Sequence, residues 1–136
     1  MIRVVVDTNV YISALVFGGK PRFALQEVEA RGIQLVASRE LEAELVDTLM
    51  DKFGWAGEQV REARERLWQA AYWSSPEPLT GVVRDADDNH VIAVSLESGA
   101  QFIVTGDRDL LTLESFKGIP ILRPAAFLEH LRGQSQ

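Results

Sequence analysis

The sequence predicts a three-layer α/β/α sandwich around a mainly parallel β-sheet. Short apolar runs alternate with longer segments in which apolar residues recur every three or four positions. Strands that are separated by helices pair in parallel, and the helices then cover both faces of the sheet. The length of 136 residues suits one compact domain. We expect that domain over residues 1–132, followed by a short C-terminal tail at 133–136.

The chain opens with one predicted strand and two predicted helices. The strand is expected at Arg3–Val6, where β-branched residues run up to Asp7. A helical segment follows at Asn9–Phe17 and ends at a pair of glycines. Pro21 is typical of the first turn of a helix, so it opens the second helix, which Gly32 closes.

The middle of the chain continues the alternation of strands and helices. The second strand is expected at Gln34–Ala37, and Ser38 then caps the third helix. Apolar residues at every fourth position indicate that helix: Leu41, Leu45, Leu49 and Phe53. A fourth helix over Ala56–Ala71 precedes a short strand at Tyr72–Ser74.

The last third of the chain adds two strands and two helices. Asp85 caps a helix that runs to Ser98. Strands follow at Gln101–Val104 and Ile119–Leu122, and a proline opens the last helix, Ala125–Arg132. In open parallel sheets, ligands bind outside the carboxyl ends of the strands, where the crossover helices also begin. Polar residues at these positions are therefore the candidates for a site.

The composition excludes several kinds of site. The chain has no cysteine, which removes disulfides, thiolate metal sites and cysteine nucleophiles. No apolar stretch is long enough to span a membrane, and the N-terminal residues do not resemble a signal peptide, so we expect a cytoplasmic protein. The net charge of −6 argues against a broad nucleic-acid-binding surface but suits a site made of carboxylates.

Four acidic residues from separate segments are expected at one edge of the sheet. Asp7 follows the first strand, and Asp107 follows the fourth. Asp88 and Glu44 lie near the beginnings of two crossover helices. Each residue alone has a structural explanation, such as helix capping or a solvated helix face. Their convergence favours a function, because clustered carboxylates repel one another unless cations lie between them.

Two of these assignments keep alternatives. The beginning of the fifth helix offers three candidates for the third acidic residue: Asp85, Asp87 and Asp88. Of these, Asp88 shares a helical face with apolar residues. The polar face of the third helix carries four acidic residues, and periodicity does not choose among them. These are Glu40, Glu44, Asp47 and Asp51.

A group of carboxylates without cysteine suits a hard cation, Mg²⁺ or Mn²⁺. Such an ion activates a bound water and offsets negative charge on a phosphodiester. Hydrolysis of nucleic acid is therefore the reaction that these residues indicate.

Four segments, in this order along the chain, resemble those of PIN domains: VVVDTNVYISAL, ELEAEL, RDADDNHVIAVS and FIVTGDRDLL. The branch that they resemble is that of the prokaryotic VapC-type toxins of toxin–antitoxin systems. The resemblance implies an Mg²⁺- or Mn²⁺-dependent endoribonuclease, with a sheet in the strand order 3-2-1-4-5. It also implies an RNA substrate and an antitoxin partner.

The resemblance assigns roles to individual residues. It implies that the catalytic and metal-binding residues are Asp7, Glu44, Asp88 and Asp107. It implies supporting roles for Asn9, Thr105 and Asp109. The choice of Glu44 over its acidic neighbours rests on this alignment and not on helix geometry.

A function of a different class stays open, a PIN-like module that binds proteins and has no nuclease activity. Trp55, Trp68 and Trp73 lie in a segment away from the acidic motifs. Such residues are more often part of a core, but they also suit an interface, and we expect a homodimer. Binding of Mg²⁺ or Mn²⁺ distinguishes the two functions, because the module does not require it.

Overall fold

The computed structural model describes residues 1–133 and contains a six-stranded sheet. The strands lie in the order β3-β2-β1-β4-β6-β5; β5 pairs antiparallel with β6, and the other pairs are parallel. The five predicted strands are present in the expected order. The strands are β1 Arg3–Val6, β2 Gln34–Ala37, β3 Tyr72–Trp73, β4 Phe102–Val104, β5 Ser115–Phe116 and β6 Ile119–Leu122.

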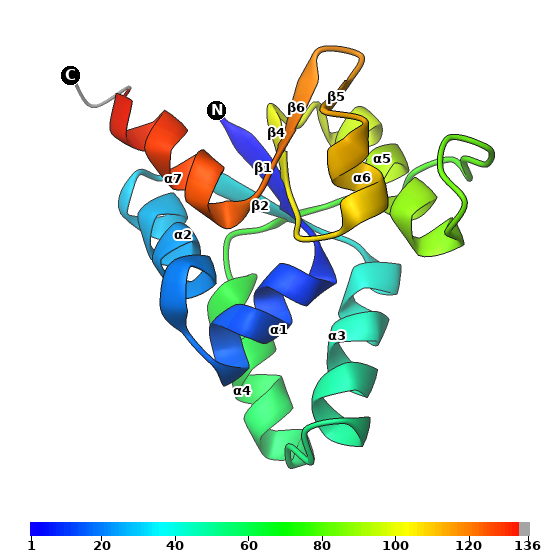
Figure 1. Cartoon of the computed structure of the whole chain (residues 1–136). Helices are drawn as coiled ribbons and strands as arrows, with labels where there is room; N and C mark the ends of the chain where they lie inside the picture. Colours follow the sequence, from blue (N-terminus) through cyan, green and yellow to red (C-terminus); the bar gives the residue numbers. More distant parts are fainter. Residues whose placement is uncertain (134–136) are drawn as a thin grey trace.

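Within residues 1–133, seven helices accompany the sheet and cover both of its faces (Figure 1). α1, α2, α4 and α7 pack on the face that carries Val4 and Val6, whereas α5 and α6 pack on the face that carries Val5. Neighbouring valines enter different cores because side chains alternate along a strand. The helices are α1 Thr8–Val16, α2 Gly19–Ala30, α3 Arg39–Asp51, α4 Gly57–Leu67, α5 Ala86–Ser98, α6 Arg108–Thr112 and α7 Pro124–Gly133.

The helix bounds differ most from the predicted ones at the start of α2 and the end of α4. α2 begins at Gly19, two residues before Pro21. A proline fits in that first turn because its missing N–H would have no partner inside the helix. α4 ends at Leu67 rather than at Ala71, because the backbone leaves helical geometry at Trp68.

The sequence did not predict α6 or β5. α6 has five residues, and β5 has two residues and forms a hairpin with β6. The turn of that hairpin holds Lys117 and Gly118 at positive φ angles of 48° and 81°. Elements this short carry too little periodicity to be recognised. The omission of α6 matters because this helix carries Asp109.

α7 ends at Gly133, and the rest of the expected tail, residues 134–136, lies outside the described residues. The division into a domain at 1–132 and a tail therefore stays a prediction. Within residues 1–133, no helix is both long and apolar enough to cross a membrane.

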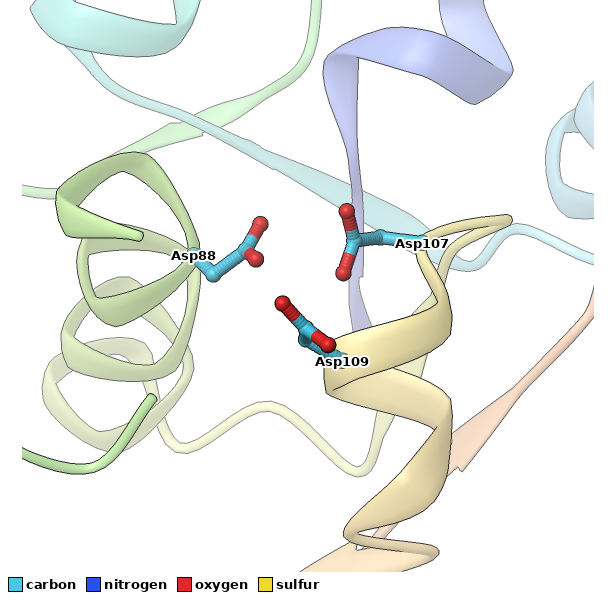
Figure 2. A group of neighbouring side chains, drawn as sticks. All are labelled: Asp88, Asp107 and Asp109. Carbon is cyan, nitrogen blue, oxygen red and sulfur yellow. The ribbon is translucent and has the colours of Figure 1, made fainter. Parts of the chain in front are cut away.

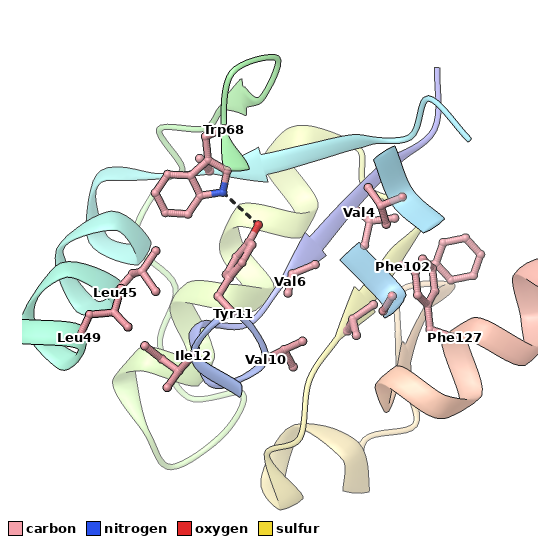
Figure 3. Packing of buried hydrophobic residues seen from close by; sticks show 14 of the residues in the cluster. Val4, Val6, Val10, Tyr11, Ile12, Leu45, Leu49, Trp68, Phe102 and Phe127 are labelled. Carbon is pink, nitrogen blue, oxygen red and sulfur yellow. Dashed lines mark hydrogen bonds between the residues drawn. The ribbon is translucent and has the colours of Figure 1, made fainter. Parts of the chain in front are cut away.

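A buried aromatic pair joins α1 to the end of α4 (Figure 3). The Trp68 Nε1–H donates to the Tyr11 hydroxyl at 3.0 Å, and the two rings meet edge to face with centroids 5.5 Å apart. Tyr11 is 1% exposed and Trp68 is 5% exposed, so bulk water does not compete for this bond. Burial also raises the pKa of Tyr11. The pair fixes α1, which begins at the acidic edge of the sheet, against α4.

The variant Tyr11→Phe removes the acceptor and leaves the Trp68 N–H buried without a partner. An unsatisfied buried donor costs about 1–3 kcal/mol, so the free energy of unfolding in urea should fall by that amount. Tyr72→Phe is the matched control, because the Tyr72 hydroxyl donates to Glu97 at the surface. A loss in Tyr11→Phe no larger than the loss in Tyr72→Phe would contradict this account of the pair.

Candidate functional site

Asp7 stands at the carboxyl end of β1 and caps α1. Its N–H donates to the Val104 carbonyl at 2.9 Å. Its carboxylate accepts from the Thr8 N–H at 2.8 Å, the Asn9 amide at 3.2 Å and the Thr105 hydroxyl at 2.7 Å. Burial raises the pKa of Asp7, and these three bonds oppose the rise. A carboxylate has about four acceptor positions, so Asp7 keeps one for a further ligand.

Thr105 and Asn9 connect the loops that follow β1 and β4. The Thr105 hydroxyl accepts from the Asp107 N–H at 3.0 Å, and Asn9 Oδ1 accepts from the Gly106 N–H at 3.2 Å. Both side chains also donate to Asp7. Each of them therefore bridges Asp7 to the loop that carries Asp107.

Asp88, Asp107 and Asp109 bring their carboxylates together, as Figure 2 shows. One oxygen from each lies within 4.8 Å of the others. Asp88 comes from α5, Asp107 caps α6 by accepting from the Leu110 N–H at 3.1 Å, and Asp109 lies in the first turn of α6. We call these three residues the carboxylate triad. Asp109, expected as a supporting residue, belongs to it, and Asp7 does not.

Asp88 is the most deeply buried member of the carboxylate triad. It is 6% exposed, and its Oδ2 is buried without a hydrogen-bond partner. Burial raises the pKa of Asp88 to about 7, and the negative charges of Asp107, Asp7 and Asp85 add to the rise. The other two candidates for this position are exposed: Asp85 caps α5 by accepting from the Asp87 N–H at 2.8 Å. The structure thus places Asp88 in the group and leaves its two neighbours outside.

Glu44 is half-buried in the second turn of α3, close enough to Asp7 and Asp87 for their charges to act on it. Burial raises the pKa of Glu44 to about 7, and the charges of Asp87 and Asp7 contribute further. Glu40 is more exposed and lies 3.2 Å from the Nε2 atom of His90. Tertiary contacts thus distinguish the two glutamates, which helix periodicity did not.

Three contacts at this edge were not predicted from the sequence. Arg84 forms an ion pair with Asp109 at 3.5 Å, and the buried Asn89 side chain bonds to the loop before α5. The Ser38 hydroxyl lies 2.8 Å from His90 Nε2, which joins the beginning of α3 to α5. Residues of these types are common on helices and loops, so their spacing carries no signal.

The residues at this edge fit a divalent metal ion. The carboxylate triad offers oxygen ligands only, and such ligands suit a hard cation. The Asp88 oxygen without a partner and the repulsion between like charges are both relieved by a bound cation. The acidic group is therefore compatible with metal binding.

Comparisons with known proteins agree with this architecture. An uncharacterized protein of Methanocaldococcus jannaschii, MJ1680, is 32% identical over 117 residues, which cover 82% of this chain and 75% of that protein. The crystal structure of FitAcB from Neisseria gonorrhoeae contains a chain of similar fold, with a TM-score of 0.58, 16% identity and coverage of 90% of this chain and 98% of that chain. The family pattern of the PIN domain matches residues 3–109. The resemblance drawn from the four motifs is thus confirmed, and the chain belongs to the PIN domain family.

Proposed function

We propose that this protein is an Mg²⁺- or Mn²⁺-dependent endoribonuclease that hydrolyses RNA phosphodiester bonds, and that it is the toxin of a toxin–antitoxin system. The observation that carries the proposal is the Asp88 oxygen, which is buried without a partner beside Asp107 and Asp109. Membership of the PIN domain family supports a nuclease-type role.

The chain's own residues divide the work at this edge. Asp88, Asp107 and Asp109 would hold the metal ion, and Asp7 would add its remaining acceptor position and its negative charge. When bound, the ion supplies a polarised water and offsets charge that develops on the scissile phosphate. Glu44, which lies near Asp7 and Asp87, would orient the attacking water. Asn9 and Thr105 are positioning residues, because they hold Asp7 to the loop before α6.

A groove lined by residues outside the acidic edge is a candidate surface for the antitoxin partner. This groove of about 880 Å³ opens between α1, α2, β2 and α4. Its apolar lining includes Leu15, Leu25, Leu35, Trp55 and Leu67. Such a groove suits the apolar face of a partner helix. The groove also suits the alternative function, an interaction module without nuclease activity. The observation that favours the nuclease over this module is the carboxylate triad.

The homodimer stays a proposal, and the structure changes its basis. Trp68 is buried in the core and cannot form an interface. Trp73 is 46% exposed and stays available for an interface. Further exposed rings lie at the ends of α1 and α3, where Phe17 is 75% exposed and its ring centroid lies 6.0 Å from that of Phe53. We propose that this pair contributes to self-association.

Asp88→Asn is the sharpest test of the metal site. Metal at about 100 times its dissociation constant should stabilise the wild-type protein by roughly 2.7 kcal/mol, seen as a rise in Tm. Asp88→Asn should fold, lose this rise and lose cleavage of single-stranded RNA. Asp7→Asn is a less specific test, because the NH2 group of the new amide cannot accept the hydrogen bonds that the Asp7 carboxylate accepts. Its effects on folding and on metal binding would therefore be mixed.

Asp47→Asn is the matched control, since it removes one charge from an exposed position of α3. It should keep both the metal-dependent rise in Tm and the cleavage. Glu40→Gln is a poorer control, because Glu40 contacts His90. Cleavage by Asp88→Asn that resists EDTA would refute the proposed mechanism.

The stability of the metal-free protein should depend on pH. The pKa values of Asp88 and Glu44 are raised to about 7, so their ionisation opposes folding. This loss is absent below the ordinary pKa near 4 and complete above about pH 7. The free energy of unfolding in EDTA should fall between about pH 4 and pH 7, by on the order of 1–3 kcal/mol after allowance for solvent screening. Excess Mg²⁺ should abolish this fall. A free energy of unfolding that does not change with pH in EDTA would contradict the account of buried, mutually repelling carboxylates.

Sedimentation equilibrium tests the homodimer. The wild-type protein should show twice the mass of one chain, and Phe17→Ser with Phe53→Ser should weaken association because the exposed apolar rings are lost. Phe23→Ser is the control, since Phe23 is also exposed but lies on α2. A wild-type monomer at every concentration would rule out the homodimer.

A further inference from the structure

Arg84 brings a positive charge to the carboxylate triad. Its guanidinium lies 3.5 Å from Asp109 Oδ2, and its side chain is 91% exposed. An ion pair so open to solvent contributes little to stability. The energy of this ion pair is therefore too small to account for the position of Arg84. For the same reason, the guanidinium can leave the carboxylate for another anion at small cost in free energy.

The Asn89 side chain fixes the backbone just before Arg84. Asn89 is 5% exposed, and its Oδ1 accepts from the N–H groups of Val82 and Val83 at 3.2 and 3.0 Å. Its Nδ2 donates to the Val83 carbonyl at 3.0 Å. Three bonds thus tie the loop to α5 beside Asp88, so the loop delivers Arg84 to the carboxylate triad.

An RNA substrate approaches this edge against strong repulsion. The whole chain has a net charge of −6, and seven acidic residues gather at the edge. They are Asp7, Glu44, Asp85, Asp87, Asp88, Asp107 and Asp109. A nucleic-acid backbone binds through cations that neutralise its phosphates. A guanidinium is suited to this role, because its planar donors match two phosphate oxygens.

We propose that Arg84 binds a backbone phosphate of the RNA beside the carboxylate triad, and that Asn89 positions it. On binding, the guanidinium leaves Asp109 and donates to the phosphate oxygens. This inference rests on the ribonuclease function proposed above. It assigns substrate binding to a loop residue and leaves the acidic residues to the metal ion.

RNA binding tests the role of Arg84 separately from cleavage. Fluorescence anisotropy with a single-stranded RNA in Mg²⁺ is measured on the Asp88→Asn background, where the RNA should stay intact. Adding Arg84→Ala should weaken binding by about tenfold to a hundredfold, the range for a hydrogen bond to a charged group. The slope of log affinity against log salt should fall by about one, and Arg84→Lys should recover part of the affinity. Arg132→Ala on α7, which removes the same charge elsewhere, should change neither quantity.

Steady-state kinetics of RNA cleavage, measured on protein that keeps Asp88, tests whether Asn89 positions Arg84. Arg84→Ala should raise KM and leave kcat and the Mg²⁺ concentration for half-maximal activity nearly unchanged. Asn89→Ala should raise KM in the same way, with little further effect when Arg84 is already alanine, because the two residues act as a unit. A purely structural role of Asn89 would instead lower stability and kcat and would add to the Arg84 variant.

The outcomes distinguish this inference from the function on which it rests. If the wild-type protein cleaves RNA but Arg84→Ala leaves affinity, KM and salt slope unchanged, the role of Arg84 is refuted and the nuclease stands. If no cleavage occurs but RNA binding depends on Arg84, the nuclease is refuted and the phosphate contact stands. If no variant binds RNA, both are overturned.

Discussion

The hydrogen bond between the Thr105 hydroxyl and the Asp7 carboxylate joins the two loops on which the site depends. β1 and β4 are neighbours in the sheet, so their carboxyl ends bring Asp7 and Asp107 close together. Like charges would drive these loops apart. Thr105 opposes this by donating to Asp7 and accepting from the Asp107 N–H, and Asn9 adds a second bridge through Gly106. The caps of α1 and α6 are therefore set by one small network.

The other acidic residues at this edge of the sheet lower the stability of the fold. Asp88 is buried on α5 beside two other carboxylates and has an oxygen without a partner, which an ordinary core does not tolerate. Burial also raises the pKa of Glu44, so two helices carry carboxylates whose ionisation is opposed by their surroundings. The aromatic pair of Tyr11 and Trp68 and the valines of β1 supply the apolar core that offsets this cost. Local rules of folding are broken at functional sites and kept elsewhere.

Much of the architecture was predictable, and the omissions have physical reasons. β1, β2 and α3 have patterns long enough to show their period, and Ser38 caps α3 as expected by accepting from the Leu41 N–H. α6 has five residues, and its beginning looks like a turn after Gly106, so Asp109 was expected to assist rather than to join the carboxylate triad. For Asp7 and Asp107, helix capping and the proposed site role do not exclude each other. Each residue caps a helix and stands at the acidic edge as well.

The sequence by itself determined the order of the longer elements and which acidic residues reach the carboxyl edge of the sheet. These follow from periodicity along the chain and from the rule that parallel strands end at a common edge. Only the tertiary structure decided which carboxylates meet, because side-chain direction and burial depend on packing between segments far apart in the chain. It brought Asp88, and not its exposed neighbours, together with Asp107 and Asp109. It also placed Arg84 beside Asp109 through the buried Asn89, a contact that no local pattern records.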